Sequence, residues 1–178
     1  MLVNADLHIH SCFSMATSKD MLINNIAPKS KEKGLNLVGT GDAFHPGWLN
    51  IIEESTEYKG DGVYSKDECD FILTTEVEGK SRIHHLIFLP TIEIARELSD
   101  KLVSKNKNSD GRPRTKMGGA EILEMVKEYD CMIGPAHAFT PWTGMYKSFD
   151  SIYDCYDKKP DFIECVKLYL VYQIISLG

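Results

Sequence analysis

The sequence predicts an α/β protein, because short apolar runs alternate with amphipathic helical segments and polar residues stand where several of the apolar runs end. Hydrophobic residues make up 43% and charged residues 26% of the 178 residues, which are the proportions of a folded domain. We therefore expect a single domain whose functional groups lie at the carboxyl ends of its strands.

The expected elements follow from local patterns. Residues 23–33 have helical periodicity and precede Gly34, a usual residue at the end of a helix, and Pro28 fits best if it lies in the first turn. Residues 71–77 and 83–89 are rich in β-forming residues and are separated by Glu-Gly-Lys-Ser, which predicts a hairpin. The expected strands are residues 2–7, 35–40, 71–77, 83–89, 131–134 and 161–164, and the expected helices are residues 23–33, 48–58, 91–103 and 120–129.

Charge and cysteine content restrict the function and the location. The net charge of −6 argues against a broad basic surface for nucleic acid, but it is compatible with a nuclease that holds DNA locally. The five cysteines are scattered without a Cys-x-x-Cys pair and no secretory signal follows Met1, so we expect a cytoplasmic protein with reduced thiols. The apolar residues 166–177 are fewer than the ~20 that span a bilayer, so a buried final strand or helix is expected there.

His8 and His10 are the sharpest chemical signal in the sequence. Residues i and i+2 of a strand point to the same face, so both imidazoles can reach one ion. Imidazole suits zinc, manganese or iron. Asp6 beside the pair either orients one of these imidazoles or ties down the turn that follows.

Two carboxylates are further candidates. Asp42 directly follows the expected strand at residues 35–40, where it serves a metal site or else an Asx-turn or helix cap. Glu76 lies inside an apolar strand, where a carboxylate is costly unless it is paired or bound to metal. Glu78 has the same strand parity as Glu76 but stands nearer the turn, so we expect it to be exposed.

The remaining histidines differ in how well their sequence positions suit metal binding. His84 and His85 are adjacent in a strand and point to opposite faces, so only one of them can face a site. His137 ends the strand-like run at residues 132–137. His45 lies in a Pro-Gly turn, and we expect it to be exposed or to contact a substrate.

In chain order, these residues resemble the motifs of the PHP (polymerase and histidinol phosphatase) superfamily. The matching runs are Asp-Leu-His-Ile-His-Ser at 6–11, Gly-Thr-Gly-Asp at 39–42, Thr-Thr-Glu at 74–76, His-His-Leu-Ile-Phe at 84–88 and Gly-Pro-Ala-His at 134–137. More narrowly, Ile-Gly-Pro-Ala-His-Ala-Phe-Thr-Pro-Trp-Thr at 133–143 looks like the archaeal endonuclease Q family, which nicks DNA on the 5′ side of deaminated bases such as uracil and hypoxanthine.

The resemblance implies a fold, a partner and a metal centre. Residues 1–164 would form an incomplete PHP-type distorted (β/α) TIM-like barrel, with residues 165–178 as a divergent apolar tail. The partner would be DNA with deaminated bases. Two to three divalent ions (zinc, manganese or magnesium) would bind. Glu76 would bridge two of them, and Asp42 would contribute to a third. Ser14 stands where many relatives place a metal-binding Asp or His. The ligands so implied are His8, His10, Asp42, Glu76, His85 and His137.

One departure from the family stands at the end of the chain. The family completes its centre with a late Asp-x-His motif, and this sequence reaches Gly178 with no histidine after His137. We therefore expect a truncated family member with little or no nuclease activity of its own.

The implied chemistry is metal-assisted hydrolysis of a phosphodiester, which needs no protein nucleophile. Basic residues of the segment 105–116 are candidates to hold phosphate, or else belong to a solvated loop. The aromatic residues Phe139, Trp142 and Tyr146 after His137 are candidates to stack on an extruded nucleotide, or else pack in the core. The candidate substrate-binding residues are Arg112, Arg114, Lys116, Phe139 and Trp142.

Two other functions stay open on the sequence. A small-molecule phosphatase related to histidinol phosphatase would use the same ligands. A catalytically dead remnant that binds metal or a protein partner is the alternative outside enzymes. The oligomeric state is not predicted, although an open sheet edge would favour self-association.

Overall fold

The structure is a computed structural model that describes residues 3–104, 106, 108–165 and 174–176. The strands are β1 (Ala5–Asp6), β2 (Leu37–Gly39), β3 (Glu57–Gly60), β4 (Val63–Lys66), β5 (Cys69–Glu78), β6 (His84–Leu89), β7 (Met132–Pro135), β8 (Phe162–Glu164) and β9 (Ile174–Ser176). The α-helices are α1 (Ile23–Glu32), α2 (Pro46–Ser55), α3 (Ile92–Lys101), α4 (Gly119–Lys127) and α5 (Ile152–Tyr156).

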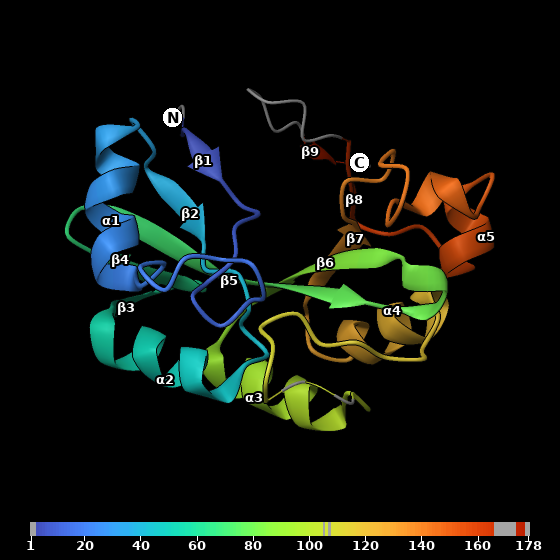
Figure 1. The fold of residues 1–178 in the computed structure, drawn as a ribbon, viewed down its shortest axis with the longest axis horizontal. Helices are drawn as coiled ribbons and strands as arrows, with labels where there is room; N and C mark the ends of the chain where they lie inside the picture. Colours follow the sequence, from blue (N-terminus) through green and yellow to red (C-terminus); the bar gives the residue numbers. More distant parts are fainter. Residues whose placement is uncertain (1–2, 105, 107, 166–173, 177–178) are drawn as a thin grey trace.

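The long strand β5 organises the sheet. Residues 70–72 of β5 pair with β2 in parallel, residues 69–72 pair with β4 in antiparallel orientation, and residues 73–78 pair with β6. Strand β1 pairs with β2 in parallel, β7 pairs with β6 in antiparallel orientation, and β8 lies beside β7. Figure 1 shows the sheet curling from β1 and β2 through β5 and β6 to β7, with β8 beside β7 and with α2, α3 and α4 on one side of β5 and β6.

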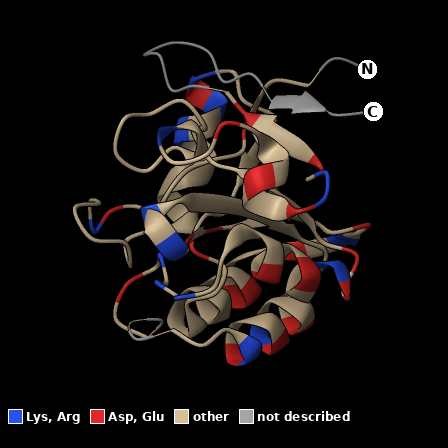
Figure 2. Ribbon diagram, turned by 90° about the vertical axis from the view of Figure 1, so that its right-hand side faces the viewer, with Lys and Arg blue, Asp and Glu red and all other residues tan. Residues whose placement is uncertain are grey.

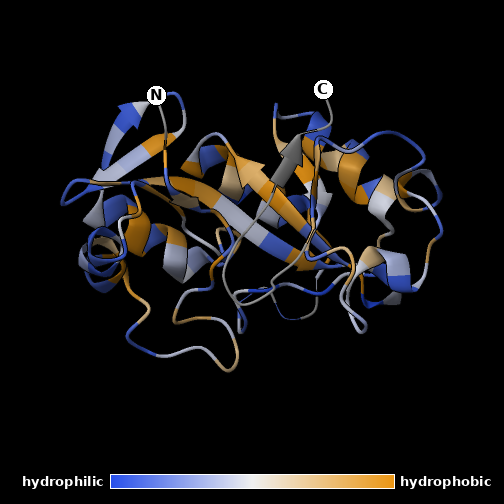
Figure 3. Ribbon diagram, turned by 90° about the horizontal axis from the view of Figure 1, so that it is seen from above, coloured by the Kyte–Doolittle hydropathy of each residue, from blue (hydrophilic) through white to orange (hydrophobic). Residues whose placement is uncertain are grey.

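The strand directions bring the carboxyl ends of the parallel strands to one edge of the sheet. Strands β1, β2 and β5 run parallel, and β7 runs parallel to β5 because both are antiparallel to β6. The carboxyl ends of β1, β5 and β7 and the amino end of β6 therefore lie at the same edge of the sheet. Figure 3 shows hydrophobic stretches of the central strands interrupted by hydrophilic ones.

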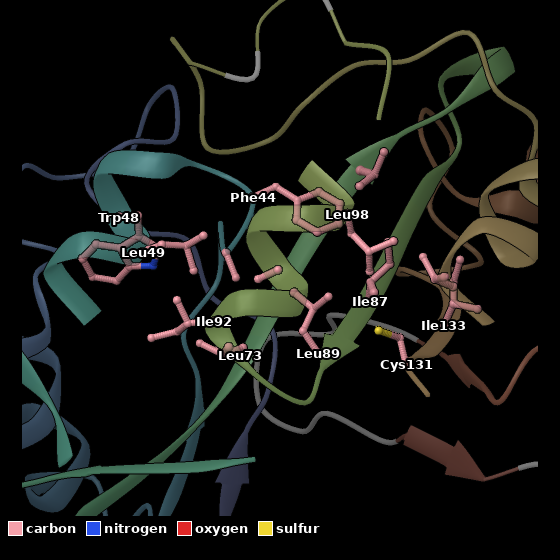
Figure 4. Close-up of a cluster of buried hydrophobic side chains, with 14 of the residues drawn as sticks. Phe44, Trp48, Leu49, Leu73, Ile87, Leu89, Ile92, Leu98, Cys131 and Ile133 are labelled. Carbon is pink, nitrogen blue, oxygen red and sulfur yellow. The ribbon is translucent and has the colours of Figure 1, made fainter. Parts of the chain in front are cut away.

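The hydrophobic core lies between the sheet and the helices, as Figure 4 shows with Trp48, Leu73, Ile87 and their neighbours. Trp48 of α2 is fully buried, and its indole N–H donates to the carbonyl oxygens of Thr40 and Gly41 at 3.2 and 2.8 Å. Helix α2 thereby holds the turn that leads to Asp42. Figure 2 shows acidic residues along the outer surfaces of the helices, in keeping with the net charge of −6.

Replacing Trp48 by Ala is expected to lower the free energy of unfolding by about 3–5 kcal/mol, because the change empties a large buried volume. Urea denaturation followed by circular dichroism measures this effect. Trp142→Ala is the matched control: that side chain is 74% exposed, so its replacement should change stability by less than about 0.5 kcal/mol. Equal effects of the two changes would contradict this account of the core.

The α/β class and most expected elements are confirmed, and two details of the helices differ. Pro28 is the sixth residue of α1 rather than part of its first turn. The side chain of Pro28 and the residue four positions earlier, Asn24, are both exposed, so water can solvate the carbonyl group that loses its helical partner. Helix α2 ends at Ser55 because the β3–β4 hairpin, which was not predicted, begins at Glu57.

Three further expectations concern the sheet, the tail and the thiols. The sheet is curled like half of a barrel, while the PHP-type barrel remains an interpretation of the sequence resemblance. Within the expected final element, residues 174–176 form β9 on β8, and residues 166–173 and 177 lie outside the described part. All five cysteines are free, as expected. In the described part of the chain, no helix has the length and apolar character needed to cross a membrane.

Candidate metal centre

Four histidines surround the buried carboxylate of Glu76 at the edge of the sheet where the carboxyl ends of β1, β5 and β7 lie. His8 and His10 follow β1, His84 begins β6 and His137 follows β7. Glu76 is 2% exposed, and the imidazole nitrogen facing its carboxylate lies at 3.5 Å for His8, 3.4 Å for His10, 2.8 Å for His84 and 2.9 Å for His137. The rings of His8 and His137 stack with centroids 5.8 Å apart.

These residues form two groups that share Glu76. One group is His8, His10 and Glu76, and the other is Glu76, His84 and His137. Within each group the potential ligand atoms lie within 4.8 Å of one another. Imidazole nitrogens with a carboxylate are donors that suit zinc, manganese or iron, and one carboxylate can bridge two ions. The donor set therefore fits a pair of divalent cations.

The charges at the centre are strongly coupled. Burial raises the pKa of Glu76, but hydrogen bonds from His10, His137, His8 and His84 outweigh burial and hold this pKa well below its usual range. Burial lowers the pKa of His8, but Glu164 and Glu76 raise it to about 10. Glu76 therefore carries a negative charge, and a cation that binds there displaces protons from the surrounding imidazoles.

The structure places His84, not His85, against Glu76, so the expectation that His85 faces the site is wrong. In the β5–β6 pairing Glu78 lies opposite His84, and Val77 lies opposite His85. Because residues opposite each other share a face, His84 lies on the face of Glu76 and Glu78. The Nδ1 atom of His85 instead hydrogen-bonds to a tyrosine hydroxyl, that of Tyr156, at 2.7 Å on the other face.

Glu78 and His85 have environments that sequence reasoning did not anticipate. Glu78 was expected to be exposed, but its side chain is largely buried and lies 3.3 Å from Nε2 of His84. Burial, together with the charge of His84, lowers the pKa of His85 to about 3, so His85 is neutral. Its role in this structure is to pack between β6 and α5.

Asp42 contacts a histidine of the centre without belonging to either ligand group. Its Oδ1 lies 3.0 Å from Nδ1 of His10, and the hydroxyl of Ser14 donates to the same oxygen at 3.0 Å. Its Oδ2 accepts hydrogen bonds from the backbone N–H and the hydroxyl of Ser11, both at 2.6 Å. Burial lowers the pKa of His10, but Asp42 and Glu76 raise it to about 9. The expected contribution of Asp42 to a third ion stays a prediction.

Glu164 is a residue of the centre that sequence reasoning missed. Its carboxylate oxygens lie 2.9 and 2.8 Å from Nδ1 of His8, and the backbone N–H of His137 donates to the carboxylate at 2.8 Å. Burial raises the pKa of Glu164, but the bond to His8 outweighs burial and lowers it. A signal was present, because Glu164 is a carboxylate at the end of an apolar strand, as Glu76 is within one.

Of the candidate basic residues, Arg112 reaches the centre. Its Nη1 donates to Oε2 of Glu76 at 3.1 Å. The surrounding segment is anchored, since Asp110 is buried and accepts a hydrogen bond from the N–H of Arg112, and Gly111 donates to the carbonyl of Phe13. Arg114 and Lys116, on the same segment, are exposed. The interpretation as a solvated loop therefore fits only part of the segment.

The aromatic candidates lie beside His137 on the segment after β7. Phe139 and Trp142 are 58% and 74% exposed, so neither packs in the core. Phe139 stacks on Tyr146 with ring centroids 4.8 Å apart. His45 was expected to be exposed or to contact a substrate; it is instead buried, stacked on the ring of Phe13 at 4.1 Å.

Comparisons with known proteins place this geometry in context. No protein-family model matches the chain. The uncharacterized protein MJ0043 of Methanocaldococcus jannaschii is 49% identical over 145 residues, which cover 80% of this chain and 17% of that protein. The crystal structure of the lesion-specific endonuclease PfuEndoQ from Pyrococcus furiosus matches with a TM-score of 0.90 and 48% identity, covering 93% of this chain and 42% of that one.

A second solved structure is Endonuclease Q in complex with a 27-mer duplex substrate that has an abasic lesion at the active site. It matches with a TM-score of 0.88 and 48% identity, covering 92% of this chain and 42% of that one. This chain is thus a close structural match to part of Endonuclease Q. It spans less than half the length of each of these relatives.

Proposed function

We propose that this chain is the metal-binding part of a PHP-type phosphodiesterase that acts as an Endonuclease Q-like nuclease on damaged DNA. The observation that carries the proposal is the pair of ligand groups sharing the buried carboxylate of Glu76. The match at 48% identity to an endonuclease described as lesion-specific supports the reaction class. Deaminated bases such as uracil and hypoxanthine are the proposed lesions, following the sequence resemblance.

The residues of the centre have distinct roles in this proposal. His8, His10 and Glu76 would hold one ion, and Glu76, His84 and His137 the other. Divalent ions held by these residues would supply the Lewis acidity that activates a water molecule and neutralises phosphoryl oxygens. The chain contributes placement and charge, and no side chain is assigned as a nucleophile.

Substrate contacts are proposed on both sides of the centre. Arg112 offers a guanidinium group 3.1 Å from Glu76, and its Nε is buried without a hydrogen-bond partner among the described residues, so it has donors for a phosphate oxygen. Arg114 and Lys116 would contact the DNA backbone further out. Phe139 and Trp142 present exposed rings on which a base displaced from the duplex can stack.

The test is to graft residues 1–164 of this chain in place of the matching segment of the Pyrococcus furiosus enzyme. The purified chimera is assayed with manganese, magnesium or zinc on duplexes containing uracil, hypoxanthine or an abasic site. We expect incision at the lesion that a chelator abolishes. A folded, metal-loaded chimera that leaves all three duplexes intact would overturn the proposal, and hydrolysis of histidinol phosphate instead would favour the phosphatase alternative.

Arg112→Ala in the chimera is expected to lower kcat/KM for lesion incision by roughly 10–100-fold, because a charge-assisted hydrogen bond to phosphate contributes about 1.5–3 kcal/mol. Lys116→Ala is the matched comparison on the same segment. It should weaken binding to all duplexes alike and reduce the slope of log affinity against log salt by about 1. An Arg112→Ala chimera with unchanged kcat/KM would contradict a contact between Arg112 and the reacting phosphate.

A further inference from the structure

The two histidines that follow β1 each bridge an inner and an outer carboxylate. His10 has Nε2 at 3.4 Å from Glu76 and Nδ1 at 3.0 Å from Asp42. His8 has Nε2 at 3.5 Å from Glu76 and Nδ1 within 2.9 Å of both oxygens of Glu164. In each case Nε2 faces the centre and Nδ1 faces away from it.

We propose that Asp42 and Glu164 are positioning residues, which hold His10 and His8 in the tautomer that presents Nε2 to a divalent ion, and that Asp42 is not itself a ligand. The inference rests on the proposed metal-dependent function. An ionised carboxylate only accepts hydrogen bonds, so Nδ1, which faces Asp42 or Glu164, keeps its proton, while a cation bound at Glu76 would take the place of the proton on Nε2. A neutral imidazole with its proton on Nδ1 has its lone pair on Nε2, where the cation would bind.

The surroundings of Asp42 leave no room for an ion on its carboxylate. Each oxygen has two polar partners: Oδ1 has Ser14 Oγ and His10 Nδ1, and Oδ2 has the N–H and hydroxyl of Ser11. A carboxylate has about four lone-pair positions, and these partners use them. Gly111 closes the remaining side, because a Cβ atom at that position would lie 2.4 Å from Cγ of Asp42.

The other two imidazoles also have one ring nitrogen toward Glu76 and the other toward an outer polar group. His137 has Nε2 at 2.9 Å from Glu76 and Nδ1 at 3.0 Å from the hydroxyl of Thr140. His84 is reversed, with Nδ1 at 2.8 Å from Glu76 and Nε2 at 3.3 Å from Glu78. The pattern assigns Nε2 as the ligand atom in His8, His10 and His137 and Nδ1 in His84.

Asp42→Asn tests the proposal with little change in shape. The Asn oxygen can still accept from Ser11, but its amide group then donates toward Nδ1 of His10 and favours the proton on Nε2, where it blocks an ion. We expect zinc affinity at one of the two sites to fall by roughly 10–100-fold, as for other losses of groups that orient a ligand. The number of zinc ions bound at saturation should stay at two.

The decisive readout is the tautomer of His10, measured by nitrogen-15 NMR on the zinc-loaded full chain, with the signal assigned by its loss in His10→Gln. The original chain should show a protonated Nδ1 and a zinc-bound Nε2, and Asp42→Asn should lose this signature. Asp70→Asn is the matched control, because Asp70 also accepts a hydroxyl hydrogen bond, from Ser65 at 2.7 Å, but is exposed. It should change neither zinc affinity nor the spectrum.

Glu164→Gln is a second variant, in which zinc affinity and the protonated-Nδ1, zinc-bound-Nε2 signature of His8 should be lost in the same way. It keeps the test informative if Asp42→Asn does not fold. One fewer zinc ion in Asp42→Asn with an unchanged His10 tautomer would make Asp42 a direct ligand and overturn the proposal. A zinc-bound Nδ1 of His10 in the original chain would overturn it as well. These readouts involve no DNA, so a chimera that fails to incise DNA while the zinc signatures hold would count against the proposed function alone.

Discussion

Replacing Glu76 by Gln is expected to weaken both metal sites together. Each ligand group contains this carboxylate, so no other single substitution of the described residues removes a ligand from both groups. An amide oxygen is neutral and a poorer ligand than a carboxylate. Loss of groups that merely orient a ligand costs roughly 10–100-fold in affinity, so loss of the shared ligand should cost at least 100-fold at both sites.

The same change should also remove the stabilisation that metal gives to the fold. An ion that binds only the folded chain stabilises it by about 2.7 kcal/mol at a concentration 100 times its Kd. The original chain should therefore melt at a higher temperature with zinc than with chelator, and Glu76→Gln should lose most of that difference. Calorimetric titration and thermal melting measure the two effects.

Glu124→Gln is the control for charge alone. Glu124 lies on α4 with its side chain 67% exposed, in an ion pair with Lys158. Its replacement removes the same charge from a residue outside both ligand groups and should leave zinc binding and zinc-dependent melting unchanged. If Glu76→Gln still bound two zinc ions with the original affinity, the shared carboxylate would not be a metal ligand.

Much of the centre follows from patterns within single strands. The two-residue period of a strand places His8 and His10 on one face. The high cost of burying an isolated carboxylate singles out Glu76. His137 follows from its place at the end of an apolar run. These are local signals, and the structure brings these four side chains together.

The rest of the centre depends on partners that are distant in sequence. Glu164 has the local pattern of Glu76, but its partner His8 is 156 residues away, and only the curl of the sheet joins them. Asp42 follows a strand as expected, yet its role is set by Ser11, Ser14 and the close approach of Gly111. The basic composition of residues 105–116 gave no indication that Arg112 would contact Glu76.

Which of His84 and His85 faces the centre depends on the pairing register between β5 and β6, and the two-residue alternation of a strand alone does not decide it. Strand alternation says only that the two residues face opposite sides. The β5–β6 hairpin fixes the choice, because its turn at residues 79–83 pairs Glu78 with His84. Because Glu76 and Glu78 point to the same face of the sheet and Glu78 lies opposite His84, His84 also points to the face of Glu76. Motif similarity between adjacent histidines cannot supply this information, since a shift of one residue reverses the assignment.

His84→Ala and His85→Ala are therefore expected to have opposite effects. His84→Ala removes a side chain 2.8 Å from Glu76 and should weaken zinc binding at one site by at least 10–100-fold, with a small loss of stability in the metal-free chain. His85→Ala removes the partner of the Tyr156 hydroxyl, which is deeply buried. Leaving that hydroxyl unpaired costs about 1–3 kcal/mol, and the cavity adds to the loss.

Calorimetric titration with zinc and urea denaturation in the presence of chelator separate the two effects. His85→Phe is a useful third variant, because it fills the space of the imidazole and should recover part of the packing without offering a ligand. The expected order of zinc affinity is His85→Ala close to the original chain and His84→Ala far below it. A larger loss of zinc from His85→Ala, with stability unchanged, would mean that His85 turns into the centre when metal binds and that the register found here does not decide the ligand.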